Sequence, residues 1–586
     1  MLGGVPVVAT AGHVDHGKST LVLALTGTDP DRWAEEKSRG LTIDLGFAAT
    51  DLGAGRLELV DVPGHVRFLP NMLAGVGAVD ACLFVVAATE GWKPQTEEHL
   101  RILELLGVDR GVVALTKVGL VDEDEQQLAR WEVEERLAGS PLDGAPIVGV
   151  DAPAGIGLED LRAALAGMLA GLADPPDRRR PRLWVDRSFA ARGSGTVVTG
   201  TLVGGRLAVG DDVELRPSGR RARVRALQTH GAAVDEVGPG HRVAVNLVGV
   251  SHQEVRRGEA LVRPGQWVAT ARFDGSLGVL AALDHDVSRR GAHILHVGTA
   301  AVPCRLRVLG PDKLAPGESG LVRVHLPTQL PLQPGDRFVV REHGRGETVG
   351  GGEVLDVDPV LRVSKARPDR SIARVVAERG WVTADMLERL TGEPAAPTVG
   401  RWVASPEALT ATVASVAEAV EAAGPLGLDA AALDKKQRLV AEAGLVGGVA
   451  LLDGRWRLAA AAPDVLEDHP WLAAVRAEPF APPPPDGVDR TELREMARRG
   501  LVVERDGIWF AAEALDRAAA ATSDLLSENP DGVTLSQLRE VWGTTRKWAV
   551  PLASLLDATG ATRRRGDLRV AGPRLPDAPA PADRSR

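Results

Sequence analysis

A glycine-rich decapeptide at residues 11–20 reads AGHVDHGKST. It fits the pattern Gly-x4-Gly-Lys-[Ser/Thr], with an apolar strand-like run before it at residues 5–9 and a helical run after it at residues 20–26. This strand–loop–helix context distinguishes a phosphate-binding loop from a chance glycine-rich turn. The backbone N–H groups of such a loop point at phosphate oxygens, and the start of the following helix adds partial positive charge. The sequence therefore predicts an α/β domain that begins with a phosphate site.

Two side chains of this loop have specific expected tasks. Lys18 is expected to reach the β- and γ-phosphates, and the hydroxyl group of Ser19 is an expected ligand of Mg²⁺. The residues of the loop expected to contact the nucleotide are Gly12, His13, Val14, Asp15, His16, Gly17, Lys18, Ser19 and Thr20.

A second motif, Asp61-Val-Pro-Gly64-His65, follows a strand pattern at residues 57–60. Asp61 can hold Mg²⁺ at the end of that strand, Gly64 can offer its N–H to the γ-phosphate, and His65 is placed to orient an attacking water. Thr42, in the sequence RGLTI between the two motifs, is the expected second hydroxyl ligand of Mg²⁺, from a loop that orders around the γ-phosphate. Together these motifs predict a GTP switch, with His65 as its catalytic residue.

The motif expected to recognise the base departs from the usual pattern. Residues 116–119 read TKVG, whereas the GTPase signature [Asn/Thr]-Lys-x-Asp ends in a carboxylate that pairs with guanine. Lys117 can still stack its aliphatic stem over the base. The nearest following carboxylate is Asp122, which either replaces the missing group or is the N-cap of the helical run at residues 123–137.

A milder departure follows the strand pattern at residues 147–150. Asp151-Ala152 stands there, where GTPases commonly carry Ser-Ala. A site without a partner for the base edge discriminates weakly, which predicts a weaker preference for GTP over xanthosine and inosine triphosphates. The base contacts are expected from Thr116, Lys117, Asp122 and Ala152.

Length and composition agree with a multidomain cytoplasmic protein. The 586 residues suggest about four domains, and the sequence shows neither a signal peptide nor an apolar run that could span a membrane. Cys82 and Cys304 lie far apart in apolar segments, which favours buried free thiols over a disulfide or a metal site. The net charge of −10 means that any contact with nucleic acid comes from local basic patches.

The organisation of the chain changes at the proline-rich linker of residues 174–181. Before the linker, strand and helix patterns alternate; after it, short valine-rich runs alternate with Gly and Pro turns, which is typical of β-barrels. The pattern predicts two small barrels with a break near residues 263–265. The expected strands are residues 196–202, 212–215, 221–227, 242–247, 305–309, 320–326 and 337–341.

A repeat marks the last part of the chain. Trp402, Trp456 and Trp509 are spaced by roughly 55 residues, and Leu568 continues the series. The last three of these residues follow a helix end, a strand pattern and a tight Gly turn, which predicts winged-helix units repeated about four times. A helical solenoid with a coincidental Trp period is the alternative, which the hairpin turns disfavour.

The predicted fold class is therefore multidomain, with an α/β P-loop GTPase domain, two β-barrel domains and a C-terminal array of about four winged-helix modules. The expected boundaries are 1–174 for the GTP-binding domain, 180–264 and 265–362 for barrel domains 2 and 3, and 365–405, 406–462, 463–511 and 512–573 for the winged helices.

The final module carries the basic residues expected to bind RNA. Residues 534–543 read as a helix and its stop, and residues 544–556 as a recognition-type helix whose start offers free backbone N–H groups. A charge run is often only a solvated face, but here both basic clusters fall on the helix start and the wing of one module in an acidic chain. The candidate residues are Thr545, Arg546, Lys547, Arg563, Arg564 and Arg565, with Arg569 also on the wing.

The whole plan resembles the translational GTPases, in which a GTP domain is followed by two β-barrels, as in elongation factor Tu. Three segments, WVDRSFAARGSGTVVTGTL at 184–202, LHVGT at 295–299 and GGGEVLD at 350–356, are similar to the bacterial selenocysteine-specific elongation factors (SelB family). The resemblance implies a cytoplasmic, monomeric GTPase with GTP and Mg²⁺ as cofactors. It also implies delivery of selenocysteinyl-tRNA to the ribosome at a UGA codon marked by an mRNA hairpin.

The same resemblance implies roles for individual residues. Asp186, Arg187 and Arg242 stand at the positions of the selenocysteine pocket, where the two arginines would face the selenolate and the aspartate would orient them. For each, a surface ion pair is the alternative. Val14 and Leu41 stand where related factors keep an apolar gate against premature hydrolysis.

Two other functions stay open at this point. A sulfate-activation GTPase subunit shares the three-domain core but has no reason to carry winged helices. The second alternative is a winged-helix regulator that binds DNA and senses a nucleotide through its front domain. A comparison of binding to an RNA hairpin with binding to duplex DNA would distinguish this alternative from a translation factor.

Overall fold

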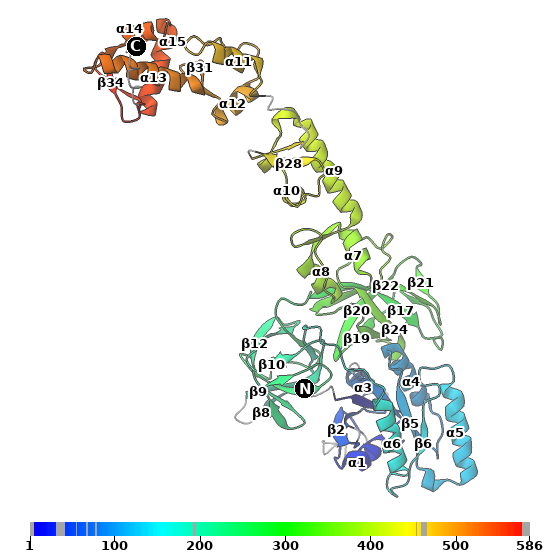
Figure 1. Cartoon of the computed structure of the whole chain (residues 1–586). Helices are drawn as coiled ribbons and strands as arrows, with labels where there is room; N and C mark the ends of the chain where they lie inside the picture. Colours follow the sequence, from blue (N-terminus) through cyan, green and yellow to red (C-terminus); the bar gives the residue numbers. More distant parts are fainter. Residues whose placement is uncertain are drawn as a thin grey trace. The chain divides into compact units, whose positions relative to one another are not determined.

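The computed structural model describes residues 5–30, 42–53, 55–65, 68–76, 79–191, 195–452, 454–458 and 466–576. The chain divides into two compact units, residues 1–408 and residues 409–586 (Figure 1). Every helix in the described part is too short or too polar to cross a bilayer. Cys82 and Cys304 are buried and free, as predicted.

The first unit begins with a sheet of order β2-β3-β1-β4-β5-β6, in which only β2 is antiparallel to its neighbour. Helices lie on both faces, so the central strands β1, β4 and β5 are buried along their whole length. The strands are β1 (Val7–Ala11), β2 (Gly46–Asp51), β3 (Arg56–Asp61), β4 (Ala81–Ala87), β5 (Gly111–Thr116) and β6 (Ile147–Gly149). The helices are α1 (Lys18–Thr26), α3 (Leu69–Val76), α4 (Pro94–Leu106), α5 (Glu123–Leu137) and α6 (Leu158–Leu169).

This topology brings the predicted motifs together. The parallel strands β1, β3, β4, β5 and β6 present their carboxyl ends at one edge of the sheet, where ligands of open α/β sheets bind. The phosphate loop, the turn after Asp61 and the segments that follow β5 and β6 all begin at this edge. The α/β fold predicted from the sequence is confirmed.

Two β domains follow. The first is an eight-stranded sheet, with the small pair β10–β14 beside it. Its strands are β7 (Arg182–Trp184), β8 (Arg187–Ala191), β9 (Gly195–Val203), β10 (Leu207–Ala208), β11 (Asp212–Arg216), β12 (Arg220–Thr229), β13 (Ala232–Val234), β14 (Glu236–Val237), β15 (Arg242–Val248) and β16 (Ala260–Val262).

The second β domain is a closed barrel of order β17-β22-β20-β19-β23-β24. Each strand predicted from the sequence is present, and the predicted break falls between β16 and β17. The strands are β17 (Thr270–Val279), β18 (Val287–Ser288), β19 (His293–Val297), β20 (Ala300–Val308), β21 (Lys313–Leu314), β22 (Ser319–Leu330), β23 (Arg337–Glu342) and β24 (Glu347–Asp356).

The first unit ends with a short helical segment packed on the closed barrel. It contains α7 (Ile372–Arg379), β25 (Trp381–Thr383), α8 (Ala384–Thr391) and β26 (Trp402–Ala404). Val376 of α7 and Leu387 of α8 share one apolar core with Phe338 of the barrel. Trp402 opens β26, which pairs with β25 across α8 and is not the second strand of a tight hairpin. The first copy of the repeat therefore differs from the three that follow.

The second unit repeats helices followed by a β-hairpin. The hairpins are β28–β29, β30–β31 and β33–β34, and their second strands carry Trp456, Trp509 and Leu568 as predicted. The elements are α9 (Pro406–Ala422, which starts just before the unit boundary), β27 (Leu428–Asp429), α10 (Lys435–Glu442), β28 (Val449–Leu452), β29 (Arg455–Leu458), α11 (Pro470–Ala477), α12 (Arg490–Arg498), β30 (Val502–Arg505), β31 (Ile508–Ala511), α13 (Ala512–Glu528), β32 (Val533–Thr534), α14 (Leu535–Val541), α15 (Arg546–Thr559), β33 (Thr562–Arg565) and β34 (Leu568–Ala571).

The turn of the second hairpin shows why the sequence signal was clear. Asp506 and Gly507 connect paired residues Arg505 and Ile508, and their φ angles are 51° and 78°. Two positive φ angles define the turn that suits the twist of a hairpin, and Asp-Gly is a preferred sequence for it. The count of four winged-helix modules stays a prediction.

Candidate functional site

The phosphate loop is clamped between β1, β4 and α4. Gly12 has φ 134°, and a Cβ atom at this position would collide with the carbonyl oxygen of Val85 in β4. The N–H of Gly12 donates to Nδ1 of His99 in α4, at 3.0 Å. Gly17, with φ 86°, caps the start of α1. Glycine is required at residue 12 because the loop passes directly against another backbone.

Lys18 lies buried in the centre of this loop. Its Nζ donates to the carbonyl oxygens of Gly12 (3.1 Å) and His13 (2.6 Å). Burial lowers the pKa of Lys18 to about 8, against the opposing effect of Asp61. Bound phosphates would supply the negative charge that this desolvated ammonium group lacks. A Cβ atom on Gly64 would collide with Lys18 Nζ, so the Gly64 backbone closes directly over the loop.

Three oxygen atoms from three separate segments converge beside Lys18. Ser19 Oγ lies 2.8 Å from Thr42 Oγ1 and donates to Asp61 Oδ2 at 2.7 Å. The other carboxylate oxygen of Asp61 accepts from Thr10 Oγ1 at 2.8 Å, which fixes the orientation of the group. Hydroxyl and carboxylate oxygens are the ligands that Mg²⁺ prefers. The residues present therefore fit a magnesium ion, as the sequence motifs predict.

The predicted catalytic residue, His65, follows β3 at the same edge. Its ring lies against Phe68, with 6.0 Å between the ring centroids, and its carbonyl oxygen accepts from the Phe68 N–H at 2.8 Å. Val14, one half of the predicted gate, lies in the phosphate loop, and Leu41, the other half, lies outside the described residues. The roles of His65 and of the gate stay predictions.

Two residues of α4 that the sequence analysis missed support the loop. His99 accepts from Gly12, and Gln95 Oε1 lies 3.4 Å from the Val14 nitrogen, which donates to it. Residues four apart share a helix face, so one turn of α4 is polar toward the loop. Burial lowers the pKa of His99 to about 3, which keeps the imidazole neutral and able to accept. The spacing Gln-x-x-x-His on an otherwise apolar helix face was the available signal.

Thr116 and Lys117, the residues expected to contact the base, lie at the other end of the site. Thr116 Oγ1 donates to the His16 carbonyl oxygen at 2.6 Å, which ties the end of β5 to the phosphate loop. Lys117 adopts a left-handed backbone with φ 61°, and its Nζ pairs with Glu90 at 3.1 Å.

Asp122 caps helix α5. Its carboxylate accepts from the Glu125 N–H at 2.9 Å, and the Glu125 carboxylate accepts from the Asp122 N–H at 3.2 Å. This reciprocal pair is a capping box. Of the two alternatives for Asp122, the geometry favours the helix cap. Ala152, the other expected contact near the base, lies half-buried in the turn that follows β6.

The expected selenocysteine pocket lies in the second domain. Asp186 is buried and accepts from both terminal nitrogens of Arg242, at 2.5 and 3.0 Å, and from Thr199 Oγ1 at 2.6 Å. Burial alone would raise the pKa of Asp186, but Arg242 and its other donors outweigh burial and hold the pKa below its usual value. Arg242 is thus held by a two-point ion pair.

Both arginines also contact the GTP-binding domain. The guanidinium of Arg242 lies 3.5 Å from the ring centroid of Phe47 in β2, and that of Arg187 lies 4.5 Å from it. A cavity of about 660 Å³ opens beside them. Its wall includes Glu58, whose pKa burial raises to about 7 despite Arg242 nearby. The structure therefore brings Arg187 and Arg242 to one cavity and adds Glu58, which the sequence did not reveal; the role of this cavity as a selenocysteine pocket stays a prediction.

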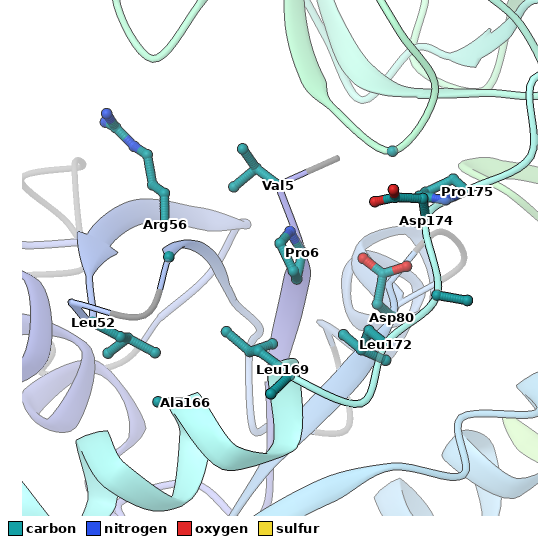
Figure 2. A pocket seen from close by; sticks show the side chains of 14 residues that line it. Val5, Pro6, Leu52, Arg56, Asp80, Ala166, Leu169, Leu172, Asp174 and Pro175 are labelled. Atoms are coloured by element: carbon teal, nitrogen blue, oxygen red, sulfur yellow. The ribbon is translucent and has the colours of Figure 1, made fainter. Parts of the chain in front are cut away.

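A second cavity, of about 360 Å³, lies at the opposite edge of the sheet (Figure 2). Val5 and Pro6 lead into β1 there, and Leu169 and Leu172 line it from the end of α6 and beyond. Two carboxylate residues, Asp80 and Asp174, line it, and Asp80 already accepts from the Val7 N–H at 2.8 Å. This cavity offers no set of groups for phosphate chemistry.

The last module presents the basic residues expected to bind RNA. The start of α15 exposes Thr545, Arg546 and Lys547, and no side chain caps its first turn. The wing strand β33 exposes its three arginines: Arg563, Arg564 and Arg565. The inclusion of Arg569 was wrong: this side chain is buried and pairs with Asp557 at 3.1 Å, because β34 turns it inward.

Four family models match parts of the chain. They are described as Elongation factor Tu GTP binding domain, over residues 4–171; Elongation factor Tu domain 2, over 195–262; Selenocysteine-specific elongation factor, beta-barrel domain, over 277–360; and Elongation factor SelB, winged helix, over 524–571.

Among curated proteins, the selenocysteine-specific elongation factor of Desulfomicrobium baculatum is 45% identical over 60% of this chain and 55% of its own length. Elongation factor Tu 2 of Streptomyces avermitilis is 34% identical over 60% of this chain and 96% of its own length. The chain spans between 55% and 64% of the length of three curated selenocysteine-specific relatives.

Among solved structures, a bacterial selenocysteine-specific elongation factor, EF-Sec, superposes with a TM-score of 0.71 at 25% identity. The superposition covers 97% of this chain and 100% of that one, so the likeness includes the helical C-terminal part. The GTP-binding and barrel domains and the terminal winged helix each match their own model. The chain belongs to the elongation factor Tu family of translational GTPases and, within it, to the selenocysteine-specific (SelB) branch.

Proposed function

We propose that this chain is a GTPase that delivers selenocysteinyl-tRNA to the ribosome at UGA codons. The observation that carries the proposal is the convergence of Lys18, Ser19, Thr42 and Asp61 at the phosphate loop, in a chain whose fold matches a bacterial EF-Sec along nearly its whole length. The loop N–H groups and Lys18 bind the phosphates of GTP. Ser19, Thr42 and Asp61 would hold Mg²⁺, which neutralises charge on the β- and γ-phosphates.

His65 orients the water that attacks the γ-phosphate, and ribosome contact brings it into place. Thr42 would complete the Mg²⁺ ligands while the γ-phosphate is bound, and loss of that phosphate would free its loop and couple hydrolysis to release of the tRNA. Asp186, Arg187 and Arg242 form the pocket for the selenocysteinyl group. A selenol is more acidic than the hydroxyl of serine, so a cation-lined pocket favours selenocysteine.

The last winged helix binds the mRNA hairpin that marks the codon. Its exposed cations on α15 and β33 contact phosphates, and splayed loop bases give sequence recognition. We further propose that the protein acts as a cytoplasmic monomer, with the domain boundaries given by the sequence analysis. A DNA-binding regulator is the competing function, and it predicts tighter binding to duplex DNA than to the hairpin.

Ribosome-stimulated hydrolysis tests the proposal. Single-turnover GTP hydrolysis is measured with selenocysteinyl-tRNA and ribosomes programmed with a UGA codon, with and without the downstream hairpin. We expect stimulation only with the hairpin, and we expect His65→Ala to remove it while GTP binding stays intact, because water positioning matters only in the transition state. Hydrolysis that is indifferent to the ribosome, or unchanged in the His65 variant, would contradict the proposal.

A further inference from the structure

Two departures from the usual GTPase motifs meet in space. Strands β5 and β6 are parallel neighbours, and their carboxyl ends lead to Gly119 and Asp151. A Cβ atom built on Gly119 would lie 2.5 Å from Oδ2 of Asp151 and 3.3 Å from its Cγ. The Asp151 carboxylate therefore occupies the space in which a side chain at residue 119 would begin. The chain lacks the usual carboxylate at residue 119, and the carboxylate of Asp151, which follows the neighbouring strand, lies in the same place.

The surrounding structure holds Asp151 rigidly. The residue is 8% exposed, and its backbone N–H and carbonyl oxygen pair with Ile156, each at 3.0 Å. One carboxylate oxygen, Oδ1, accepts from the Ala154 N–H at 3.3 Å. The other, Oδ2, faces Gly119 and accepts no hydrogen bond from the residues that the structure describes. Oδ2 therefore remains available to accept a hydrogen bond from a ligand.

Other carboxylates near the base end of the site are already engaged. Asp122 is held in the capping box of α5, and Glu90 pairs with Lys117. The segment after β5 is tied to the segment after β6, because the Val118 N–H donates to the Val150 carbonyl oxygen at 3.4 Å. Lys117 and Asp151 are therefore fixed relative to one another.

We propose that Asp151 is the residue that selects guanine, accepting hydrogen bonds from the N1–H and N2–H₂ groups of the base. The proposal rests on the proposed GTP-binding function and deepens it. Gly119 is required for this arrangement, since any side chain there would displace the carboxylate. A carboxylate on the base edge restores strong discrimination, so the weak preference for GTP expected from the absent Asp at residue 119 does not follow.

The substitution Asp151→Asn, which replaces the carboxylate with an amide of the same shape, tests the assignment. In Asp151→Asn, the amide donates where the carboxylate accepted, which suits the 2-oxo group of xanthine and not the 2-amino group of guanine. Dissociation constants for fluorescent GDP and xanthosine diphosphate are measured on the full chain. We expect GDP binding to weaken on the order of 100-fold, because charge-assisted hydrogen bonds are lost, and xanthosine diphosphate binding to strengthen. An unchanged ratio of the two constants would overturn the proposal.

Relocating the carboxylate provides a rescue. Gly119→Asp alone should weaken GDP binding, since two carboxylates would compete for one space. Gly119→Asp combined with Asp151→Ser restores the usual motif and should return the GDP preference to within a few-fold of wild type. Failure of this rescue in a folded protein, judged by circular dichroism and thermal melting, would count against the proposal.

Asp122→Asn is the matched control and should leave the ratio unchanged. A changed ratio in this variant would move the base contact to Asp122 and overturn the assignment to Asp151. If the wild-type chain bound neither nucleotide, the GTP-binding function itself would be contradicted. If it bound GDP tightly and Asp151→Asn kept the wild-type ratio, only the assignment of Asp151 would be wrong.

Discussion

At the scale of single residues, the site is supported by buried groups that must stay neutral. His99 accepts from the Gly12 N–H, and burial lowers the pKa of His99 to about 3. His16, in the phosphate loop itself, has its pKa lowered by burial to about 4. Protonation of either ring would place a cation next to buried Lys18, and protonated His99 could not accept the bond from Gly12. The phosphate loop therefore keeps its geometry only at pH values at which these two imidazole rings are uncharged.

We expect His99→Leu to weaken GDP binding and to lower the free energy of unfolding of the GTP-binding domain by about 1–3 kcal/mol, because the Gly12 N–H loses its acceptor. His99→Gln keeps an acceptor and is the matched control, with a smaller effect. Both quantities come from titration with fluorescent GDP and from chemical denaturation. Equal losses in the two variants would mean that size, and not hydrogen bonding, matters at this position.

The same group makes stability depend on pH. Below pH 6.5 the unfolded chain protonates His99 while the folded chain does not until about pH 3, so stability is complete above pH 6.5 and declines as the pH falls toward 3. The decline approaches about 1.4 kcal/mol per pH unit for one such group. Denaturation at several pH values should show a shallower decline for His99→Gln than for wild type.

The charge of the cavity beside Arg187 and Arg242, the proposed selenocysteine pocket, should also vary with pH, through Glu58. Burial raises the pKa of Glu58 to about 7, so the carboxyl group is neutral below pH 7 and adds a negative charge near Arg242 above it. We expect the preference for selenocysteinyl- over seryl-tRNA to fall between pH 6.5 and 8, and Glu58→Gln to remove this dependence. Affinities of both tRNAs with GTP bound, measured across this range, check the prediction; a flat wild-type profile would contradict it.

At the scale of elements, the sequence predicted strands and helices well where periodicity was strong. Strand β12 spans Arg220–Thr229 where residues 221–227 were expected, and α15 begins at Arg546 where residue 544 was expected. The errors concern orientation and partners. Trp402 continues the Trp period but pairs across α8, and Arg569 points into the module. Alternation along a strand does not say which face is covered.

The residues of the site also divide into those that the sequence predicted and those that it did not. The phosphate-loop residues could be predicted, because one contiguous motif determines them. The contacts of Gly12 with His99 and of Gly119 with Asp151 join strands and helices far apart in the chain. Such long-range contacts depend on the order of strands in the sheet, which a single sequence does not specify.

The start of α15 carries a prediction of its own. We expect Arg546→Ala with Lys547→Ala to weaken hairpin binding by about 1–3 kcal/mol and to flatten its salt dependence, since phosphate contacts release counterions. Arg569→Ala is the contrasting variant: it removes a buried partner of Asp557, so it should destabilise the module more than it alters the salt slope. Filter binding of the hairpin at several salt concentrations, with thermal melting of each variant, separates the two effects.

At the scale of the whole molecule, the chain divides between residues 408 and 409. The residues of the proposed nucleotide and selenocysteine sites belong to the first unit, and the basic residues of the last module belong to the second. A ligand stabilises only the cooperative unit that binds it. Each ligand of the proposed function is therefore expected to raise the unfolding temperature of only one of the two units of the intact chain.

We expect calorimetry of the full chain to resolve at least two unfolding transitions. GDP with Mg²⁺ at 100 times its dissociation constant should stabilise only the first-unit transition, by about 2.7 kcal/mol, and hairpin RNA only the other. In the Asp151→Asn variant, xanthosine diphosphate should stabilise the first-unit transition in place of GDP. The stabilisation of the other transition by RNA should stay unchanged. If GDP and RNA each shifted both transitions, the unfolding of the two units would be coupled and the assignment of separate ligands to separate units would fail. A single transition stabilised by neither ligand would contradict both binding functions, because stabilisation by mass action is unavoidable for any ligand that prefers the folded state.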